Sequence, residues 1–554
     1  MDSKDLDAEI HPLKNEDGKN KENCENGGGK EVGSKNQTAV SRLSKWRTAA
    51  FFAALFLCLV VVFAFSFIIP CPVRPHSVRT WSRTYDSAVT YPFLSANDVN
   101  KDKVLDVLFI YKSTNASNPN ISCSDEGLSS PCAFMTAVSG TNSTTLWERP
   151  VTEDVLLVEC GIEQLGGVVP SGCLIIGKPE FLTAIDFHTG ETLWQKPSSF
   201  GATYTVMKPL LKIPDVNNDN IPDLMVLVSV ENKMQIFVHS GKNGDQLSHN
   251  ASRNLDIPTG YLMHATKSQS PYIIFYNENS IYGYSLNNLY SMTTGEQNKP
   301  VTLKQDHEWE KKINITTGRI PIPVSSPGQI RYIVKVPGYY YEHLLVVTSD
   351  FSELLDGQSL RTLWSVNTST VLSEPTLGYY KKDVLDIVME VGIGVNRKKV
   401  MILESTSGSV HWELEINYRP GSPKPATLRT GDHRSTFLFW GDYQMDTNST
   451  DSPVKQNLYM FHPSRPNVIL ELKNNTEKIT AFDAVLFERS RHACYMLLNG
   501  PLASDTPGPV SLTKRKLKED ITNGKVIWLS NDNEYSEKDI RDFFFRMRYS
   551  SEIA

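Results

Sequence analysis

One long apolar segment dominates the hydrophobic pattern of this chain. The residues from Ala49 to Ile69 carry no charge, and at about 1.5 Å per helical residue they span roughly 30 Å, the thickness of a hydrocarbon core. A cleaved signal peptide would start near Met1, whereas here a long polar segment precedes the apolar run and a Pro-Cys-Pro turn follows it. The pattern therefore predicts a retained signal-anchor helix that crosses the membrane once, over residues 49–69.

The pattern changes on both sides of that helix. The first 48 residues are rich in Lys, Glu, Asp, Asn and Gly and nearly free of aromatic residues, so they bury too little apolar surface to fold and are predicted to be disordered. After about residue 75, short runs of Val, Ile, Leu, Tyr and Phe are broken by Gly, Asn, Asp and Pro. Such runs predict many short strands joined by tight turns, and hence an all-β domain.

A turn-and-strand unit repeats along the all-β part. Its clearest copy, AIDFHTGETLW, reads as a strand, a glycine turn and a second strand that closes on tryptophan. The copies end at Trp147, Trp194, Ser248, Trp364, Trp412 and Trp528. They lie about 50 residues apart or about twice that, so degenerate units are expected near residues 306 and 470, and this period in a β-rich chain is typical of a propeller.

The repeat predicts a β-propeller of about eight blades, or seven if one unit is not a full sheet. The tryptophans are expected to pack between neighbouring sheets and not on a ligand; Trp309 would serve the unit near residue 306. The predicted organisation is a disordered cytoplasmic tail (1–48), the signal-anchor helix (49–69), a juxtamembrane segment (70–90), the β-propeller ectodomain (91–533), and a C-terminal amphipathic helix with its tail (534–554).

The last part of the chain has helical periodicity. A helix over residues 536–549 would begin at Ser536, a good capping residue, and would place Ile540, Phe543, Phe544 and Met547 on one face. This face is predicted to pack against the propeller.

Two stretches place side-chain oxygens at alternate positions just before an apolar strand. Residues 98–106 read DVNKDKVLD, and residues 215–223 read DVNNDNIPD. Calcium takes about six to eight oxygen ligands, which a tight loop supplies by turning alternate residues inward. The spacing predicts two calcium sites, the first with Asp98, Asn100, Asp102 and Asp106, and the second with Asp215, Asn217, Asp219 and Asp223.

These loops have two other interpretations, an EF-hand and a plain turn. An EF-hand fails, because its sixth position needs glycine where this chain has Lys103 and Asn220, and because strands flank both loops. The alternative that Asp and Asn merely form turns stays open. It is stronger for the first loop, where Lys101 and Lys103 place two positive charges beside the cation.

Cysteines and glycosylation sequons indicate that everything after the helix passes through the secretory lumen. Two pairs of cysteines close in sequence are expected to form disulfides, Cys123 with Cys132 and Cys160 with Cys173. Cys71, at the membrane surface, is left with three alternatives: palmitoylation, pairing with Cys494, or a bridge between two chains. Eight sequons predict N-glycosylation at Asn115, Asn120, Asn142, Asn250, Asn314, Asn367, Asn448 and Asn474.

The distribution of charge predicts the orientation of the helix in the membrane and argues against one class of partner. Arg42, Lys45 and Arg47 lie just before the helix and favour a cytosolic N-terminus, the type II topology. The sequon at Asn36 should then stay unused. A net charge of −6 argues against a nucleic-acid surface. The expected localisation is the cell surface or the secretory pathway.

Several of these motifs resemble those of known propellers. The two Asp-rich loops resemble the FG-GAP calcium loops of integrin α-chain propellers, and AIDFHTGETLW resembles the repeat of quinoprotein propellers. Over essentially its whole length, the chain also resembles the FG-GAP repeat-containing membrane proteins called "family with sequence similarity 234". This resemblance rests on the order of its motifs: the acidic tail, the IIPCP exit, the CSDEGLSSPC loop, the SGTNSTTLWERP turn and the C-terminal FFFRMRY. The resemblance implies structural calcium and no established activity. The related segment Gly378–Asp386 lacks the early carboxylates, so no cation is expected there.

No common catalytic signature occurs in the sequence. Gly-x-Ser-x-Gly, His-Glu-x-x-His, Walker A and Cys-x-x-Cys motifs are absent, and the 12 histidines are scattered. The predicted function is therefore non-enzymatic: a cell-surface binding, adhesion-like or receptor-accessory propeller, with an unknown protein or glycan ligand. The alternative is a Golgi or endoplasmic-reticulum enzyme or trafficking factor that uses the propeller as a scaffold.

Overall fold

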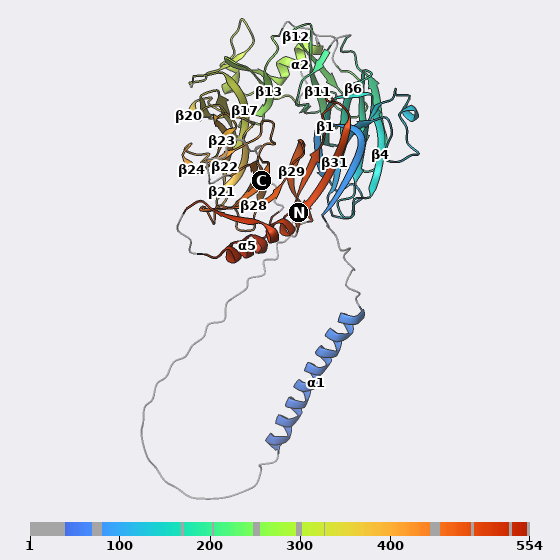
Figure 1. Ribbon diagram of the computed structural model, residues 1–554, viewed down its shortest axis with the longest axis vertical. Helices are drawn as coiled ribbons and strands as arrows, with labels where there is room; N and C mark the ends of the chain where they lie inside the picture. Colours follow the sequence, from blue (N-terminus) through green and yellow to red (C-terminus); the bar gives the residue numbers. More distant parts are fainter. Residues whose placement is uncertain are drawn as a thin grey trace, which may run out of the picture. The chain divides into compact units, whose positions relative to one another are not determined.

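The computed structural model divides the chain into two compact units, Met1–Pro75 and His76–Ala554. It describes residues 39–68, 80–167, 171–201, 204–247, 255–294, 302–325, 327–443, 455–488, 492–530 and 535–550. In the first unit, helix α1 (Ala39–Ile68) contains a stretch, Trp46–Ala64, that is long and apolar enough to cross a membrane (Figure 1). Among the described residues it is the one helix of this kind. The structure therefore has one candidate for the predicted membrane-spanning helix.

The second unit is a series of antiparallel sheets that follow one another in chain order, as the colours of Figure 1 show. Its strands include β2 (Asp106–Ser113), β3 (Cys132–Val138), β4 (Thr145–Thr152), β5 (Asp154–Glu163), β6 (Ser171–Lys178), β7 (Phe181–Asp186), β8 (Thr192–Pro197), β9 (Tyr204–Val206), β10 (Leu211–Ile213), β11 (Asp223–Val230), β12 (Lys233–His239), β13 (Gly260–Ala265), β14 (Pro271–Asn277), β15 (Ser280–Ser285) and β16 (Ile320–Ile322). Further along come β17 (Ile330–Pro337), β18 (Glu342–Thr348), β19 (Phe351–Leu355), β20 (Thr362–Asn367), β21 (Thr376–Lys381), β22 (Val384–Gly394), β23 (Arg397–Leu403), β24 (Val410–Asn417), β25 (Ala426–Arg429), β26 (Ser435–Gly441), β27 (Asn457–Phe461) and β28 (Val468–Asn474).

Most sheets have four strands, and four of them are simple meanders: β5–β8, β13–β16, β17–β20 and β21–β24. In the sheet of β9–β12, the order is β10-β11-β12 and β9 also pairs with β11. In a meander of this kind, the first-to-second and third-to-fourth turns lie at one end of the sheet, and the second-to-third turn lies at the other. The predicted all-β propeller fold is confirmed, while the predicted number of about eight blades stays a prediction.

The ends of the propeller are joined by one long strand, β1 (Trp81–Asn97). Its first half pairs with β31 (Gly508–Lys516), which follows β29 (Ile479–Glu488) and β30 (His492–Asn499), and its second half pairs with β2. The result is a seven-stranded sheet in the order β29-β30-β31-β1-β2-β3-β4. The N-terminal strand therefore holds the last part of the propeller to the first, and propeller strands begin at Trp81, inside the predicted juxtamembrane segment 70–90.

The core lies between neighbouring sheets, because each sheet buries both faces. One apolar cluster combines Leu108 and Met135 from the sheet that holds β2 with Ile175 and Ile185 from the next sheet. Similar clusters join the other neighbours. Burial on both faces explains why the strands read as almost continuous apolar runs in the sequence.

The segment after β31 departs from the repeat. It forms α4 (Leu517–Asn523), then β32 (Lys525–Trp528), which pairs with β28 as a fifth strand, and then α5 (Glu537–Arg546). The last predicted copy of the repeat, ending at Trp528, is thus a helix followed by a strand, so the prediction of a strand on both sides of its turn is wrong. Elsewhere in the described ranges, the short helices are α2 (Leu286–Thr294), α3 (His307–Glu310) and two 3-10 turns, Cys123–Glu126 and Leu165–Gly167.

The predicted C-terminal helix is confirmed, although it ends at Arg546 and not at residue 549. Ser536 caps α5, since its hydroxyl accepts a hydrogen bond from the backbone N–H of Asp539. Ile540 and Phe544 are fully buried in an apolar cluster with β25–β30, β32 and α4, and Phe543 and Met547 pack against that cluster.

Candidate functional site

The first Asp-rich loop connects β1 to β2, and its polar side chains are hydrogen-bonded within the loop. Asp98 Oδ2 accepts a bond from the N–H of Lys103 at 3.0 Å, and Asp102 Oδ1 accepts one from the N–H of Val104 at 2.8 Å. Asn100 Oδ1 accepts from the N–H of Asp102 at 3.0 Å. Asp98 Oδ1 is buried and has no hydrogen-bond partner.

The last residue of this loop, Asp106, is fully buried and fastens two turns together. Its Oδ2 accepts a hydrogen bond from the N–H of Val99 at 2.9 Å, and its Oδ1 accepts one from the N–H of Gly140 at 2.9 Å. Burial raises the pKa of Asp106 to about 6, against the effect of these bonds. The loop and the β3–β4 turn are therefore held by one carboxyl group.

The second loop, between β10 and β11, repeats this plan. Asp215 accepts hydrogen bonds from the N–H groups of Asn218 and Asn220, both at 2.7 Å. Asp219 accepts from Ile221 N–H at 3.0 Å and from the hydroxyl of Ser240 at 3.0 Å.

At the end of the second loop, Asp223 takes the place that Asp106 has in the first. It accepts from the N–H of Val216 at 2.8 Å and from that of Gly241 at 3.3 Å, and burial raises its pKa to about 6. Asn217 donates from Nδ2 to Asp219 Oδ2 at 3.0 Å.

Within the described residues, no group of three or more His, Cys, Asp or Glu side chains is placed to hold a metal ion. In both loops the oxygens of the early Asp and Asn residues accept hydrogen bonds from loop amides. The two calcium sites therefore stay a prediction.

The related segment between β21 and β22 has the same buried carboxyl group but a different neighbour. Asp386 accepts from the N–H groups of Tyr380 and Ser405, as Asp106 and Asp223 accept from theirs. Beside it, the ammonium group of Lys381 lies 2.5 Å from Glu404 Oε1. In this sheet, the positively charged side chain of Lys381 therefore lies near the buried carboxyl group of Asp386.

Five of the predicted tryptophans connect neighbouring sheets through hydrogen bonds to backbone carbonyls, which confirms their predicted packing role. Trp147 donates to Phe187 O at 3.0 Å, and Trp194 donates to Gly241 O at 3.2 Å. Three others donate in the same way: Trp309 to Gln358 O, Trp364 to Ser405 O and Trp412 to Pro466 O. Trp81, which lies outside the sequence repeat, donates to Gly140 O at 3.3 Å, where the last part of the propeller meets the first.

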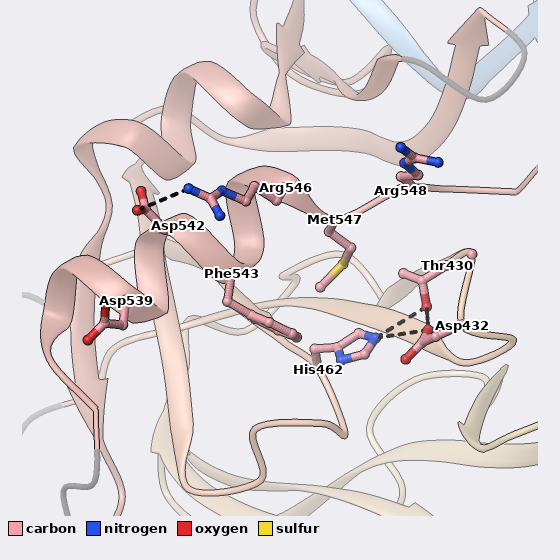
Figure 2. Close-up of a pocket in the computed structure, with 10 residues that line it drawn as sticks. Thr430, Asp432, His462, Asp539, Asp542, Phe543, Arg546, Met547 and Arg548 are labelled. Carbon is pink, nitrogen blue, oxygen red and sulfur yellow. Dashed lines mark hydrogen bonds and ion pairs between the residues drawn. The ribbon is translucent and has the colours of Figure 1, made fainter.

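A groove with mixed chemistry lies between α5 and the β25–β26 turn, and we call it the α5 groove. It has a volume of about 610 Å³. Phe543, Met547 and the buried His462 form its floor, and Figure 2 shows the first two side chains directed toward the imidazole. Its other lining residues are Thr430, Gly431, Asp432, Asp539, Asp542, Arg546 and Arg548. A volume of this size is typical of ligand sites.

Long-range contacts of the backbone bring the two sides of the groove together. Gly431 donates its N–H to Arg548 O at 2.8 Å, and Ser550 donates to Arg429 O at 3.0 Å. A β-bridge also pairs Thr430 with Tyr549. The turn and the C-terminus are more than a hundred residues apart in sequence, so no local motif predicts their contact; the sequence indicated only the apolar face of α5.

His462, Thr430 and Asp432 have the residue types of a catalytic triad but the wrong hydrogen bonds. Ser464 N–H donates to His462 Nδ1 at 3.2 Å, so in the neutral ring the proton is on Nε2, which lies 3.2 Å from Thr430 Oγ1. The Thr430 hydroxyl donates to Asp432 Oδ1 at 2.5 Å. His462 therefore has no free nitrogen to take a proton from Thr430, as a general base would need to do.

Electrostatics agree with this assignment. Burial lowers the pKa of His462 to about 4, although Asp432 opposes the shift, so the ring is neutral at physiological pH. Burial tends to raise the pKa of Asp432, but the Thr430 hydrogen bond and the positive charge of Arg434 outweigh it and hold that pKa below its usual value. The groove thus offers a neutral floor and an ionised carboxylate at its rim.

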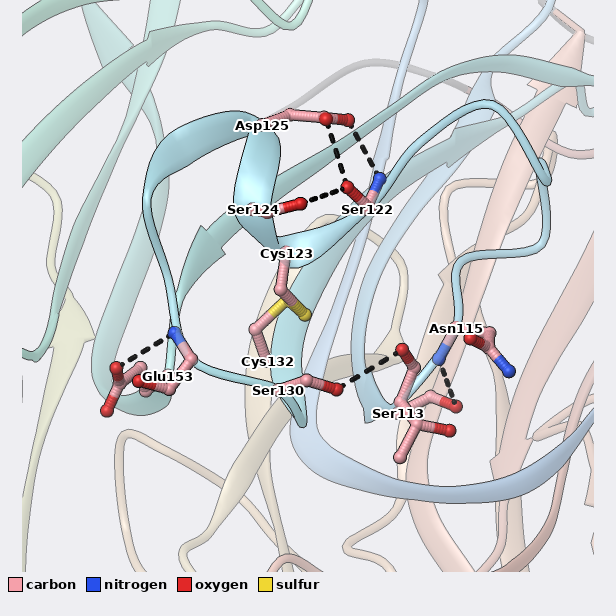
Figure 3. Close-up of a disulfide and its surroundings, with 11 residues drawn as sticks. Ser113, Asn115, Ser122, Cys123, Ser124, Asp125, Ser130, Cys132 and Glu153 are labelled. Carbon is pink, nitrogen blue, oxygen red and sulfur yellow. Dashed lines mark hydrogen bonds between the residues drawn. A yellow bond between two sulfur atoms is a disulfide. The ribbon is translucent and has the colours of Figure 1, made fainter.

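Both predicted disulfides are present, which confirms the pairs Cys123–Cys132 and Cys160–Cys173. The first closes the excursion between β2 and β3, and Figure 3 shows Ser122 and Asp125 capping the short helix beside it. Cys494 is fully buried, and Cys71 lies outside the described residues.

The predicted glycosylation sites fall on the surface wherever the structure describes them. The exposed ones are Asn115, Asn120, Asn142, Asn314, Asn367 and Asn474. The remaining two, Asn250 and Asn448, lie outside the described residues. Glycosylation itself stays a prediction.

Comparison with known proteins identifies close relatives. A family model described as "FAM234A/B beta-propeller" matches residues 81–550. The chain is 45% identical over 561 residues to protein FAM234A of Mus musculus and 45% identical over 556 residues to protein FAM234A of Homo sapiens, with 100% of each chain covered. It is 28% identical over 540 residues to protein FAM234B of Gallus gallus, and this alignment covers 94% of this chain and 85% of the FAM234B chain. Among solved structures, the WD40 domain of SCAP from fission yeast aligns with a TM-score of 0.40 and 9% identity, over 78% of this chain and 98% of that chain.

Proposed function

The chain belongs to the FAM234A/B β-propeller family, and we propose that it is a non-enzymatic type II membrane glycoprotein whose propeller binds a partner at the cell surface. The observation that carries the proposal is the α5 groove. It is open, it has the volume of a ligand site, and its histidine is hydrogen-bonded in a way that suits binding and not proton transfer.

Features outside the groove support the membrane and surface parts of the proposal. One candidate membrane-spanning helix precedes the propeller, and basic residues before it favour a cytosolic N-terminus. Two disulfides suit an oxidising compartment. Six exposed sequons are distributed over the propeller, as expected of a chain that passes through the secretory lumen.

We further propose that the loops 98–106 and 215–223 bind structural calcium, in the manner of FG-GAP loops. Each loop gathers alternate Asp and Asn oxygens around a buried aspartate, Asp106 or Asp223. In the first loop Asp98 Oδ1 is buried without a hydrogen-bond partner, and a cation would satisfy it. Because these aspartates also tie the loop to the next turn, a bound ion would stiffen the edge of its sheet.

Proximity labelling on intact cells tests the surface role. A peroxidase fused to the C-terminus of the full chain, used with a membrane-impermeant biotin phenol, should label plasma-membrane receptors. The control is the same enzyme fused to residues 1–80 alone. Labelling that appears only with a permeant substrate, on resident Golgi or endoplasmic-reticulum proteins, would contradict the surface role and favour the alternative, an enzyme or trafficking factor of the secretory pathway.

A further inference from the structure

Two histidines hold one backbone group in the seam between the sheets β13–β16 and β17–β20. The group belongs to Gly357, in the β19–β20 turn, which we call the Gly357 turn (residues 356–361). His264, on β13, lies 2.8 Å from Gly357 O through Nε2, so Nε2 carries a proton and donates it. Gly357 N–H in turn donates to Nδ1 of His343, on β18, at 3.4 Å. That nitrogen is an acceptor here, and His343 is therefore neutral in this arrangement.

Each histidine also faces a carboxylate to which it makes no hydrogen bond while it is neutral. His264 Nδ1 lies 4.0 Å from Glu342 Oε2, and within the described part of the chain both atoms are buried without a hydrogen-bond partner. His343 Nδ1 lies 3.7 Å from Asp356 Oδ2, which accepts the hydroxyl of Tyr341 at 2.8 Å instead. In both contacts an acceptor faces an acceptor, and a proton on the nitrogen would convert the contact into a charge-assisted hydrogen bond.

The Gly357 turn is the place where the sheet β17–β20 meets its neighbour. Trp309 donates to Gln358 O at 3.0 Å, and the ring of His264 stacks on Trp309 with 5.4 Å between the ring centroids. A side chain would not fit at Gly357, because a Cβ there would lie 1.8 Å from Glu342 O. Packing this close resists gradual adjustment, so a change in the hydrogen bonds of Gly357 displaces the turn as a unit.

The charges around the turn determine the pH at which it responds. Burial lowers the pKa of His264, and positive charge on Lys335 and His343 lowers it further. The hydrogen bond to the turn carbonyl and the charge of Glu342 oppose this shift; Glu342 also pairs with Lys335 at 3.0 Å. Other charged residues that lie around the turn are Lys267, Asp306, Lys312 and Arg361. His264 is therefore neutral at physiological pH and takes up a proton in a more acidic medium.

We propose that the Gly357 turn is an acid-responsive switch in the seam between these two sheets. Acid adds a proton to Nδ1 of each histidine. The hydrogen bond from Gly357 N–H to His343 is then lost, because its acceptor carries a proton. Asp356 exchanges the hydroxyl of Tyr341 for the imidazolium group, and the turn leaves the hydrogen bonds that it makes at neutral pH.

The surface that responds is the tip of the β17–β18 hairpin. Tyr339 and Tyr340 are 91% and 75% exposed there, directly before Tyr341, whose hydroxyl holds the tip to the turn. The switch therefore loosens an exposed aromatic surface when the pH falls. It does not depend on the α5 groove or on the proposed binding function.

Hydrogen exchange followed by mass spectrometry tests the switch. The full-length protein in lipid nanodiscs is labelled at about pH 7.4 and about pH 5.5, with labelling times scaled for the pH dependence of intrinsic exchange. We expect exchange in peptides that cover residues 338–343 and 355–361 to become about tenfold faster in acid, because the turn opens more often once its histidines are charged.

Two substitutions imitate the neutral histidines. His264→Gln keeps a donor for the turn carbonyl, and His343→Asn keeps an acceptor for the turn N–H, but neither side chain takes up a proton in this range. The double variant should therefore lose the acid response. His433→Gln is the matched control, since it removes a histidine 3.1 Å from Asp383 at another seam, and it should keep the response.

Three results overturn the proposal: equal exchange of the turn at both pH values, an acid response that survives in the double variant, or faster exchange throughout the propeller in acid. An unchanged melting temperature at neutral pH shows that the double variant is folded. If it is not, Glu342→Gln replaces it. That variant removes the negative charge that favours protonation of His264, so the response should require a lower pH, and an unmoved midpoint would also overturn the proposal.

Discussion

At the scale of single residues, one hydrogen-bond relay recurs at two seams of the propeller. A tryptophan N–H reaches the carbonyl of a turn glycine, and the N–H of that same glycine reaches a buried aspartate. The relay is complete from Trp81 through Gly140 to Asp106, and from Trp194 through Gly241 to Asp223. The aspartate in turn holds the preceding loop, so each seam also orders a loop at the propeller's edge.

The seam that closes the ring should be the one most sensitive to substitution. Trp81→Phe removes the hydrogen bond to Gly140 O but keeps most of the apolar contact, so the free energy of unfolding should fall by about 1 kcal/mol. Hydrogen exchange should show faster opening of β1 and β31. Trp194→Phe, at an interior seam, is the matched control and should leave exchange in β1 unchanged. Equal protection of β1 in Trp81→Phe and the parent would show that the bond contributes nothing to closure.

The calcium proposal predicts a melting temperature that depends on chelation. In calcium, Asp219→Ala combined with Asp223→Ala should lower the melting temperature, and EDTA should cause no further change, because the second loop no longer binds the ion. Asp383→Ala, in the loop where no cation is expected, should keep the parent's response to EDTA. If EDTA never shifts the melting temperature of the parent protein, the metal proposal is wrong.

The buried His462 predicts a pH dependence of stability. Its pKa is about 4 in the folded chain and about 6.5 in an unfolded one, so between these values the unfolded state binds more protons. The free energy of unfolding should therefore rise with pH across this window, and the stability is lost as pH falls through it. His462→Gln should flatten that part of the profile measured by urea denaturation. An unchanged slope between pH 4 and 6.5 in this variant would assign the dependence to other groups.

At the scale of elements, the C-terminal strap of α4, β32 and α5 decides the shape of one edge of the propeller. It adds a strand to β28 and a helix beside the β25–β26 turn, and it builds the α5 groove. Two neighbouring residues of α5 differ sharply in burial: Phe544 is fully buried, whereas Phe545 is 45% exposed.

Substitutions of this pair should differ widely in their effect. Phe544→Ala should reduce the free energy of unfolding by about 3–5 kcal/mol, because it leaves a cavity in the cluster between α5 and the sheet. Phe545→Ala should cost less than about 1 kcal/mol. Limited proteolysis of residues 525–550 checks both, and similar cleavage rates for the two variants would mean that α5 is not docked as described.

At the scale of the whole molecule, the pattern of N-glycosylation tests the expected membrane topology. With the N-terminus in the cytosol, the full chain should lose mass on treatment with peptide N-glycosidase F, and Asn→Gln substitution of the six exposed sequons should remove most of that shift. Asn36→Gln should have no effect, since that sequon precedes the helix. A shift that is abolished by Asn36→Gln alone would reverse the orientation.

The sequence was sufficient wherever the determining interactions are local. The apolar run of α1, the capping residue Ser536 and the period of the tryptophans each depend on neighbours along the chain, so hydrophobic pattern and spacing predicted the membrane helix, the C-terminal helix and the propeller. Short loops likewise predicted both disulfides, because cysteines nine and thirteen residues apart meet across a single turn.

Tertiary structure alone decided what the chain brings together from far apart. Trp81 has no repeat around it, yet ring closure places it at the turn of Gly140. Lys514 belongs to a run of basic residues, 514–518, yet it is fully buried and donates to the same carbonyl. The α5 groove arises because residues 548–550 pair with 429–431. The sequence determined the helices and strands, because these depend on local periodicity. The α5 groove was determined by ring closure and by the C-terminal strap, because contacts between distant segments leave no periodic pattern in the sequence.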